Sequence, residues 1–331
     1  MNRTALAAAA AAVVSIGAAC TQTIDAGSSR PHGPLPVDER NPVVLTNDGF
    51  DDNWQGEYAV LLANSGTLKL DAIIVSTSPG HADIEANITG WRALVQAARA
   101  SGLRNIPDPI ASTGPPLTRP ADGAIDTTAP NRSEGAHRIV DASHRLGLPY
   151  RPLVVLTGGR LTDVADAYLI DPTLPERVVV VSALGTTTSS GGAMGVPNGE
   201  MDPWAEMIVA ARFRYVQVSA YYDQLTDLPA SRVAELPANA FGAWMAAKQT
   251  KIWGVPLAAD QVAVAALCLP EFTLTVDRVS PARLIEPGAT AGPDLVSDPD
   301  GRGWLVTESM AAVATDRLWE LLGDTAASSS L

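Results

Sequence analysis

Three carboxylates and an amide crowd into one short segment of the chain, Asn47-Asp48-Gly49-Phe50-Asp51-Asp52. The segment follows an apolar run rich in β-branched residues, which is typical of a buried strand. Carboxylates packed this closely repel one another unless water solvates them or a cation neutralises them. Asp51 and Asp52 also suit the first turn of a helix, whose free N–H groups favour negative charge. One helix start rarely needs three carboxylates, so the segment favours a metal or polar-ligand site.

Polar residues also end or follow other apolar runs along the chain. Ser76 and Ser78 follow the second predicted strand. Thr157 ends a strand rich in valine and leucine, and Asp260 precedes an apolar helix. In a doubly wound sheet the carboxyl ends of the parallel strands lie along one edge, which is where ligands bind. We therefore expect these side chains to converge on the acidic segment.

Oxygen atoms from this edge of the sheet suit a hard cation. Ca²⁺ binds about six to eight oxygens from carboxylates, amides, backbone carbonyls and water. The expected ligands are Asn47, Asp52, Asp260 and a backbone carbonyl at Thr157. Taken singly, Asp260 suits a helix cap equally well, and Thr157 suits a turn from strand to helix. A Cys/His metal site is not expected, because the four histidines are scattered without ligand spacing.

The elements that must position these residues alternate between strand and helix. This alternation predicts an α/β domain with an open, mostly parallel, doubly wound sheet. Strands are expected over residues 43–46, 70–75, 106–110, 153–157, 178–184, 215–218, 272–276 and 304–306. Helices are expected over residues 54–64, 83–100, 131–146, 161–169, 203–211, 238–247, 262–267 and in a closing segment through Leu322. The Gly/Ser/Thr-rich residues 185–199 predict a binding loop, and the Pro-rich residues 113–130 a surface flap.

The charge and hydrophobicity of the chain indicate which kinds of partner it can bind. The formal net charge is −13 and lysine and arginine form few clusters, which argues against nucleic acid. An apolar share of 46% supports a sizeable core, and no segment beyond residue 20 is apolar enough to span a bilayer. The expected partner is a small molecule. The sequence leaves open whether the chain forms a homo-oligomer.

The amino-terminal residues predict export. Residues 1–20 combine Arg3 with an Ala-rich apolar stretch, as in a secretory signal. Residues 16–20 resemble a bacterial lipoprotein processing site, which would make Cys20 a lipid anchor in the cell envelope; an ordinary signal peptide is the alternative. Cys268 lies in an apolar run and is expected to be a buried thiol. Residues 21–40 are expected to be a flexible tether, residues 41–323 one domain, and residues 324–331 a disordered tail.

Several of these motifs together resemble one known family. Residues 47–52 are similar to the Asp-x-Asp-Pro-Gly-x-Asp-Asp signature of the inosine-uridine preferring nucleoside hydrolases. Residues 155–163 resemble the Thr-Gly-Pro-Leu-Thr-Asn turn of that family with one residue inserted. Asn198 with Asp202-Pro203 resembles the Glu-Phe-Asn … Asp-Pro segment, and Asp260 falls where the family has a His-Asp-Pro aspartate. The resemblance extends from Val43 to about Leu269.

The resemblance implies an open α/β sheet that holds one Ca²⁺ and cleaves the N-glycosidic bond of nucleosides. It implies that Asp52 and Asp260 bind calcium by carboxylate and Thr157 by its carbonyl. It further implies that Asp51 and Asn198 hold ribose hydroxyls. Such chemistry builds positive charge on the sugar, which nearby carboxylates stabilise, while a metal lowers the pKa of the attacking water.

The chain also departs from the family pattern. The family's metal-binding aspartate, which the resemblance makes the general base, corresponds to Asn47, whose amide ligates Ca²⁺ but does not accept a proton. Asp48 or Asp51 is the expected replacement base. Ser78 stands where the family has an asparagine, and Glu200 is the candidate for a glutamate whose position is Val196 here. By this resemblance, both Ser78 and Glu200 are expected to bind substrate.

These departures leave three functional hypotheses. The first is a calcium-dependent hydrolase of N-ribosides, with Asn47, Asp48 and Asp51 as catalytic residues. The second is a binding protein that kept the fold and the cation pocket but lost the base. The third is a lipoprotein with a structural role only.

Overall fold

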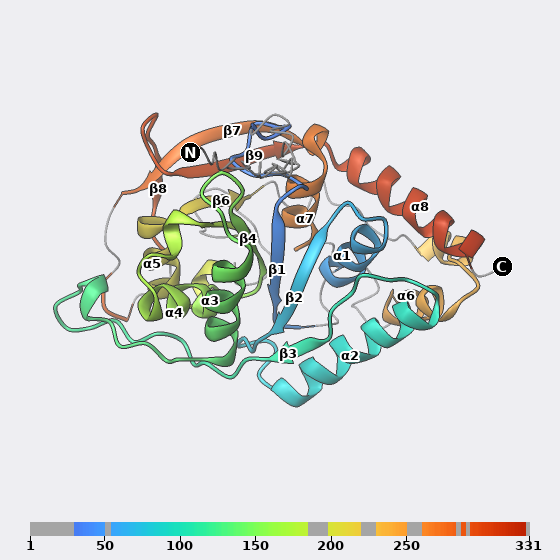
Figure 1. Ribbon diagram of the computed structural model, residues 1–331, viewed down its shortest axis with the longest axis horizontal. Coiled ribbons are helices and arrows are strands. Elements are labelled where there is room, and N and C mark those ends of the chain that lie inside the picture. Colours follow the sequence, from blue (N-terminus) through green and yellow to red (C-terminus); the bar gives the residue numbers. More distant parts are fainter. Residues whose placement is uncertain are drawn as a thin grey trace, which may run out of the picture.

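Apolar, β-branched runs form one nine-stranded sheet with the order β3-β2-β1-β4-β5-β6-β9-β7-β8 (Figure 1). The strands from β3 to β9 in this order pair in parallel, whereas β7 pairs antiparallel with β9 and β8. The strands are β1 (Pro42–Asn47), β2 (Lys69–Val75), β3 (Pro109–Ala111), β4 (Leu153–Gly158), β5 (Val178–Ala183), β6 (Arg214–Val218), β7 (Thr273–Pro281), β8 (Leu295–Ser297) and β9 (Gly303–Ser309). The prediction of a mostly parallel α/β sheet is confirmed.

The computed structural model describes residues 30–49, 54–184, 198–219, 230–249, 260–282, 286–288 and 292–328. The predicted signal and Cys20, most of the predicted binding loop, and both Asp51 and Asp52 lie outside these residues.

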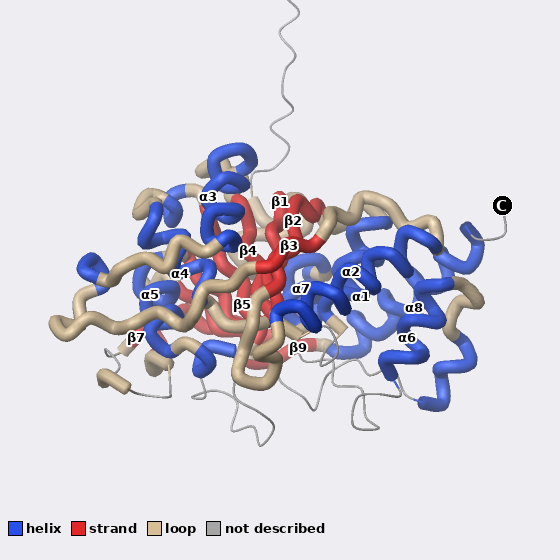
Figure 2. Tube along the Cα trace, turned by 90° about the horizontal axis from the view of Figure 1, so that it is seen from below, coloured by secondary structure: helices blue, strands red, loops and turns tan. Residues whose placement is uncertain are grey.

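Helices cover both faces of the sheet, so its central strands are buried on both sides (Figure 2). One face packs against α3 (Glu134–Leu146), α4 (Thr162–Ile170) and α5 (Pro203–Arg212). The other packs against α1 (Gln55–Asn64), α2 (Ile84–Ala100), α6 (Ala240–Gln249), α7 (Gln261–Cys268) and α8 (Ala311–Ser328). Within the described part of the chain, none of the helices combines the length and apolarity needed to cross a bilayer.

The period-two alternation of β1 explains this two-sided core. Val43 and Leu45 enter the cluster under α1, α2 and α7, whereas Val44 enters the cluster under α3, α4 and α5. Each apolar side chain that is fully buried in this way stabilises the fold by roughly 1.5–3 kcal/mol. Cys268 is buried and free, as its apolar surroundings predict.

Strand register brings three strand ends to one level. Asn47 at the end of β1 pairs with Val75 at the end of β2 and with Gly158 at the end of β4. The residues that follow these strands therefore meet at one edge of the sheet, called the carboxyl edge below. This register is the physical basis on which distant polar residues converge.

Several predictions of element boundaries were wrong. The strand predicted over residues 272–276 continues to Pro281, and β8 was not predicted. The third strand is only Pro109–Ala111, because these are the residues that pair with β2. Leu35 and Val37 are buried in the core, so the folded domain begins before residue 41. Helix α8 continues to Ser328, since Leu318, Leu321 and Leu322 anchor it against the core. Residues 324–328 are therefore helical and not part of a disordered tail.

Candidate active site

Asn47 lies at the centre of the carboxyl edge and is fully buried. Its side-chain amide donates to Gln55 Oε1 at 2.6 Å and to Asp260 Oδ2 at 3.4 Å. Gln55 stands in the first turn of α1, and its own amide donates to the backbone carbonyl of Asp260 at 3.2 Å. These contacts connect β1, α1 and α7 at one point.

Asp260 faces this point although it occupies the first position of a helix. It is the N-cap residue of α7, yet its side chain makes no capping hydrogen bond. Instead, Oδ1 accepts a hydrogen bond from Asn198 Nδ2 at 2.9 Å, while Oδ2 lies against Asn47. The structure thus favours a role for Asp260 in the site over a role as helix cap. We call Asn47, Gln55, Asn198 and Asp260 the amide–aspartate cluster.

Gly158 makes room for this cluster. A Cβ atom at this position would lie 2.2 Å from Gln55 Oε1 and 2.4 Å from Asn47 Nδ2. Any side chain here would displace both amides, so the glycine after Thr157 is more than a turn residue. Thr157 is fully buried beside it in β4.

The cluster presents oxygen atoms that suit a hard cation. Because the amide nitrogen of Gln55 is committed to Asp260, its oxygen faces Asn47, and the nitrogen of Asn47 must point toward it. This arrangement leaves Asn47 Oδ1 buried without a hydrogen-bond partner among the described residues. A buried carbonyl oxygen without a hydrogen bond is costly, and a cation such as Ca²⁺ would offset that cost by binding it.

The structure brings together most of the predicted site residues that it describes. Asn47, Asn198 and Asp260 are in direct contact, and Thr157 pairs with Thr46 in the strand beside them. Glu200 lies two residues after Asn198 in the 3₁₀ helix η4 (Asn198–Met201). The roles predicted for Asp51 and Asp52 stay predictions, since both residues lie outside the described ranges.

Asp48 points toward the turn after β2. Its side chain is 2% exposed, and its Oδ2 atom lies 3.7 Å from Nδ1 of His81. Burial disfavours the ionised carboxyl, but the neighbouring His81 and Ser78 outweigh burial and hold the pKa of Asp48 below its ordinary value. Ser78, predicted to bind substrate, therefore faces the Asp48 carboxylate.

A second buried acid, Glu206 of α5, lies behind Asn198. Its carboxyl group sits so close to the backbone of Gly199 that a Cβ atom there would overlap it. Complete burial, and to a lesser degree the negative charge of Glu200, raises the pKa of Glu206 well above its ordinary value. Burial therefore favours the protonated form of Glu206, whose carboxyl group packs against the turn that carries Asn198.

Sequence reasoning missed three residues at this edge. Gln55 and Glu206 occupy helical positions that read as ordinary polar residues, and no spacing rule separates them from solvent-exposed ones. His81 was set aside because the histidines lack metal-ligand spacing. Its place three residues after Ser78, in the same polar turn, is the signal that could have identified it.

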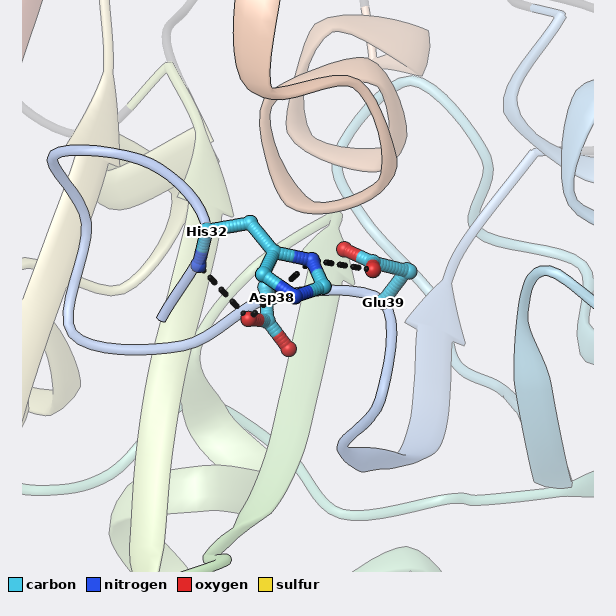
Figure 3. A group of neighbouring side chains, drawn as sticks. All are labelled: His32, Asp38 and Glu39. Atoms are coloured by element: carbon cyan, nitrogen blue, oxygen red, sulfur yellow. Dashed lines mark hydrogen bonds and ion pairs between the residues drawn. The ribbon is translucent and has the colours of Figure 1, made fainter. Parts of the chain in front are cut away.

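Another group of potential metal ligands lies at the opposite edge of the sheet. Of the residues that the structure describes, His32, Asp38 and Glu39 are close enough together to hold one ion (Figure 3). However, Arg40 donates to both carboxylate oxygens of Asp38 and, outweighing burial, holds its pKa below the ordinary value. A cation beside this guanidinium would be repelled. These residues brace the segment that leads into β1.

Comparison with known proteins supports the fold. No family model matches the sequence, and no curated protein is similar to it in sequence. Solved structures are similar to the chain in three dimensions. An inosine-guanosine nucleoside hydrolase superposes with a TM-score of 0.61 at 15% identity, covering 85% of this chain and 98% of that one.

Two bacterial structures agree with this result. A purine-preferring ribonucleoside hydrolase from Gardnerella vaginalis has a TM-score of 0.58 at 16% identity and covers 86% of this chain and 99% of its own. An inosine-uridine preferring nucleoside hydrolase from Bacillus anthracis has a TM-score of 0.59 at 14% identity and covers 88% and 100%. The protein therefore has the fold of the nucleoside hydrolases, as the residues of its strand ends predict.

Proposed function

We propose that the protein is a calcium-dependent hydrolase of N-glycosidic bonds in nucleosides or related ribosides. The observation that carries the proposal is the position of Asp260. Its carboxylate turns away from its own helix and meets Asn47 and Asn198, which come from distant parts of the chain. Convergence of this kind is expected of a binding site and not of a helix cap.

The candidate ligands for Ca²⁺ are Asn47 Oδ1, the carboxylates of Asp52 and Asp260, and the backbone carbonyl of Thr157. When bound, the ion would orient the attacking water and lower its pKa. Asp51 and Asn198 would hold ribose hydroxyls, and the nearby carboxylates would stabilise the positive charge that develops on the sugar. The ordered set of strand-end residues and the fold together support these roles.

Because position 47 is an asparagine, the proposed hydrolysis requires a general base at another position. A neutral amide does not accept a proton near neutral pH, so Asn47 can orient the water but not deprotonate it. This departure also keeps a second candidate function in view, a protein that binds a riboside and a cation without turnover. The orphaned Oδ1 atom of Asn47 supports cation binding under either function.

The test uses purified protein, p-nitrophenyl riboside and a panel of nucleosides. Each substrate is incubated with added Ca²⁺ and with a chelator. We expect turnover of at least one substrate, lost with chelator and restored by Ca²⁺. If no substrate showed turnover that the chelator abolishes, the proposed hydrolase function would be refuted.

The variant Asn47→Asp separates the two candidate functions. It restores a carboxylate at the position where the amide now stands. A parent with turnover supports the hydrolase whatever the variant does. A parent without turnover and a variant with turnover would instead support the binding protein, because only the base would have been missing.

A further inference from the structure

Gln55 of α1 is a buried amide that joins two segments of the site. Its side chain is 0% exposed. Its nitrogen donates to the backbone carbonyl of Asp260 at 3.2 Å, and its oxygen accepts a hydrogen bond from Asn47 Nδ2 at 2.6 Å. Gln55 and Asp260 have other interactions as well, so neither is a free group. The two hydrogen bonds are sufficient to set the oxygen of Gln55 against Asn47.

The orientation of the Asn47 amide follows from its contacts with Gln55 and Asp260. Rotating this amide by half a turn would place its oxygen beside Gln55 Oε1 and Asp260 Oδ2, which are both acceptors. Rotating the Gln55 amide as well would repair the first contact, but it would set Gln55 Oε1 against the carbonyl of Asp260. Each alternative brings acceptors together, so the nitrogen of Asn47 stays on the side of Gln55.

This orientation decides which atom Asn47 presents to a ligand. Its Oδ1 atom is turned away from Gln55 and is buried without a hydrogen bond among the described residues. A hard cation binds the oxygen of an amide, whereas the nitrogen carries hydrogens and would repel it. A carboxylate has two equivalent oxygens, but an amide has one. An asparagine that binds a cation must therefore be held in one of its two orientations.

The two asparagines of the amide–aspartate cluster are oriented by different kinds of group. Asn198 Nδ2 donates to the backbone carbonyl of Ala183 and to Asp260 Oδ1, both at 2.9 Å. Asn47 is oriented by a side chain, and Gly158 leaves the space in which that side chain reaches it. A substitution can remove the partner of Asn47 without changing the backbone.

We propose that Gln55 is a positioning residue that turns the oxygen of Asn47 toward the cation; this inference rests on the cation site of the proposed function. Gln55 need not touch the cation or the substrate. It is required because position 47 is an amide, whereas a carboxylate at this position would present an oxygen in either orientation. The effect of Gln55 on cation binding should therefore be specific to a chain with asparagine at position 47.

The experiment measures the Kd of Ca²⁺ by titration calorimetry on protein freed of metal, with no substrate present. Gln55→Met is made in the parent and in the variant Asn47→Asp. Gln217→Met is the matched control, because Gln217 of β6 is also 0% exposed and donates to Ser219 Oγ at 2.7 Å. Methionine has a similar length but cannot replace the amide hydrogen bonds, so both changes remove a buried amide.

We expect Gln55→Met to weaken Ca²⁺ binding by about 10–100-fold in the parent, as is typical of residues that orient metal ligands. In the Asn47→Asp background the same change should alter the Kd little, because either carboxylate oxygen can bind the ion. Gln217→Met should lower the melting temperature and leave the Kd of Ca²⁺ as in the parent. This pattern separates positioning from a general loss of stability.

The contrary outcomes are distinct. An unchanged Kd in Gln55→Met overturns the assignment. So does an equal loss in both backgrounds, or a similar loss in Gln217→Met, because the effect would then be structural. A parent that binds no Ca²⁺ refutes the cation site and this inference with it. A parent that binds Ca²⁺ and shows the expected pattern, but turns over no substrate, supports the role of Gln55 and refutes the hydrolase.

Discussion

Two aspartates at helix starts use their carboxylates in opposite ways. Asp202 precedes α5 and caps it, accepting a hydrogen bond from the amide of Ala205 at 3.1 Å. Its second oxygen accepts from Thr162 Oγ1 at 2.6 Å and from the amide of Leu117 at 2.8 Å. Asp260 precedes α7 without capping it and meets Asn47 and Asn198 instead.

The difference shows how a buried carboxylate reveals its role. The partners of Asp202 are backbone amides and a hydroxyl that would otherwise be unsatisfied, so it contributes to stability. The partners of Asp260 include two side-chain amides from distant segments, and the oxygen of one of them, Asn47 Oδ1, is buried without a hydrogen bond among the described residues. A cation would satisfy that oxygen, whereas further apolar packing would not.

The largest effect is expected for the variant Asp260→Ala, which tests whether Asp260 belongs to the site. We expect activity to fall by more than the roughly 10–100-fold that is typical of residues which only orient metal ligands. The Ca²⁺-induced rise in melting temperature should also disappear, because stabilisation by a ligand requires its binding site. The exposed Asp126, which pairs with Arg212, supplies the control Asp126→Ala. If Asp260→Ala kept the calcium response, the site assignment would be wrong.

Asp202→Ala should show the opposite behaviour. It removes a helix cap worth about 1 kcal/mol and leaves the partners Thr162 and Leu117 with unsatisfied groups at about 1–3 kcal/mol each. At roughly 2–4 °C per kcal/mol, the melting temperature should fall by about 6 °C or more. The calcium-induced rise should persist in the folded variant. A melting temperature equal to that of the parent would show that Asp202 is not structural.

Glu206→Gln should produce the smallest effect, and one that depends on pH. The folded-state pKa of Glu206 is raised, so between the unfolded pKa near 4.3 and the folded value the unfolded state binds fewer protons and stability falls as pH rises. Glutamine does not ionise, so the variant does not lose this stability as the pH rises. The variant should therefore gain melting temperature relative to the parent at pH 7.5 and little at pH 4.

Glu176→Gln, at an exposed position, is the matched control for this measurement. It should leave the melting temperature unchanged at both pH values. An equal gain for Glu206→Gln at pH 4 and at pH 7.5 would contradict the raised pKa, because the benefit would then be independent of ionisation.

Much of the fold could be predicted because the strong signals are local. The valine-rich runs of β4 and β5 are buried on both faces, and their composition shows it without reference to the rest of the chain. Ser133 is of a residue type that caps helices, and it does cap α3, accepting a hydrogen bond from the amide of Ala136. The bounds of β3 were predicted wrongly, because the length of this strand is set by its pairing with β2 and not by its own sequence.

The site was predictable to the extent that it follows strand ends. Asn47 and Asp260 could be expected to meet, since parallel strands share a carboxyl edge. The role of Gln55 could not be predicted, because it depends on the orientation of α1 and on the missing side chain of Gly158, which lets the amide of Gln55 approach Asn47. His81 depends on the folding of one turn across another, a tertiary contact that no periodicity encodes.

The brace around Asp38 determines where the polypeptide enters the domain. It lies before Pro42, the first residue of β1, whereas the proposed catalytic groups follow Asn47 at the other end of the same strand. If Cys20 carries a lipid, the nine residues between it and Arg30 span at most about 3.3–3.6 Å each. Such an anchor would join the domain at the amino end of β1, the end of that strand opposite to Asn47.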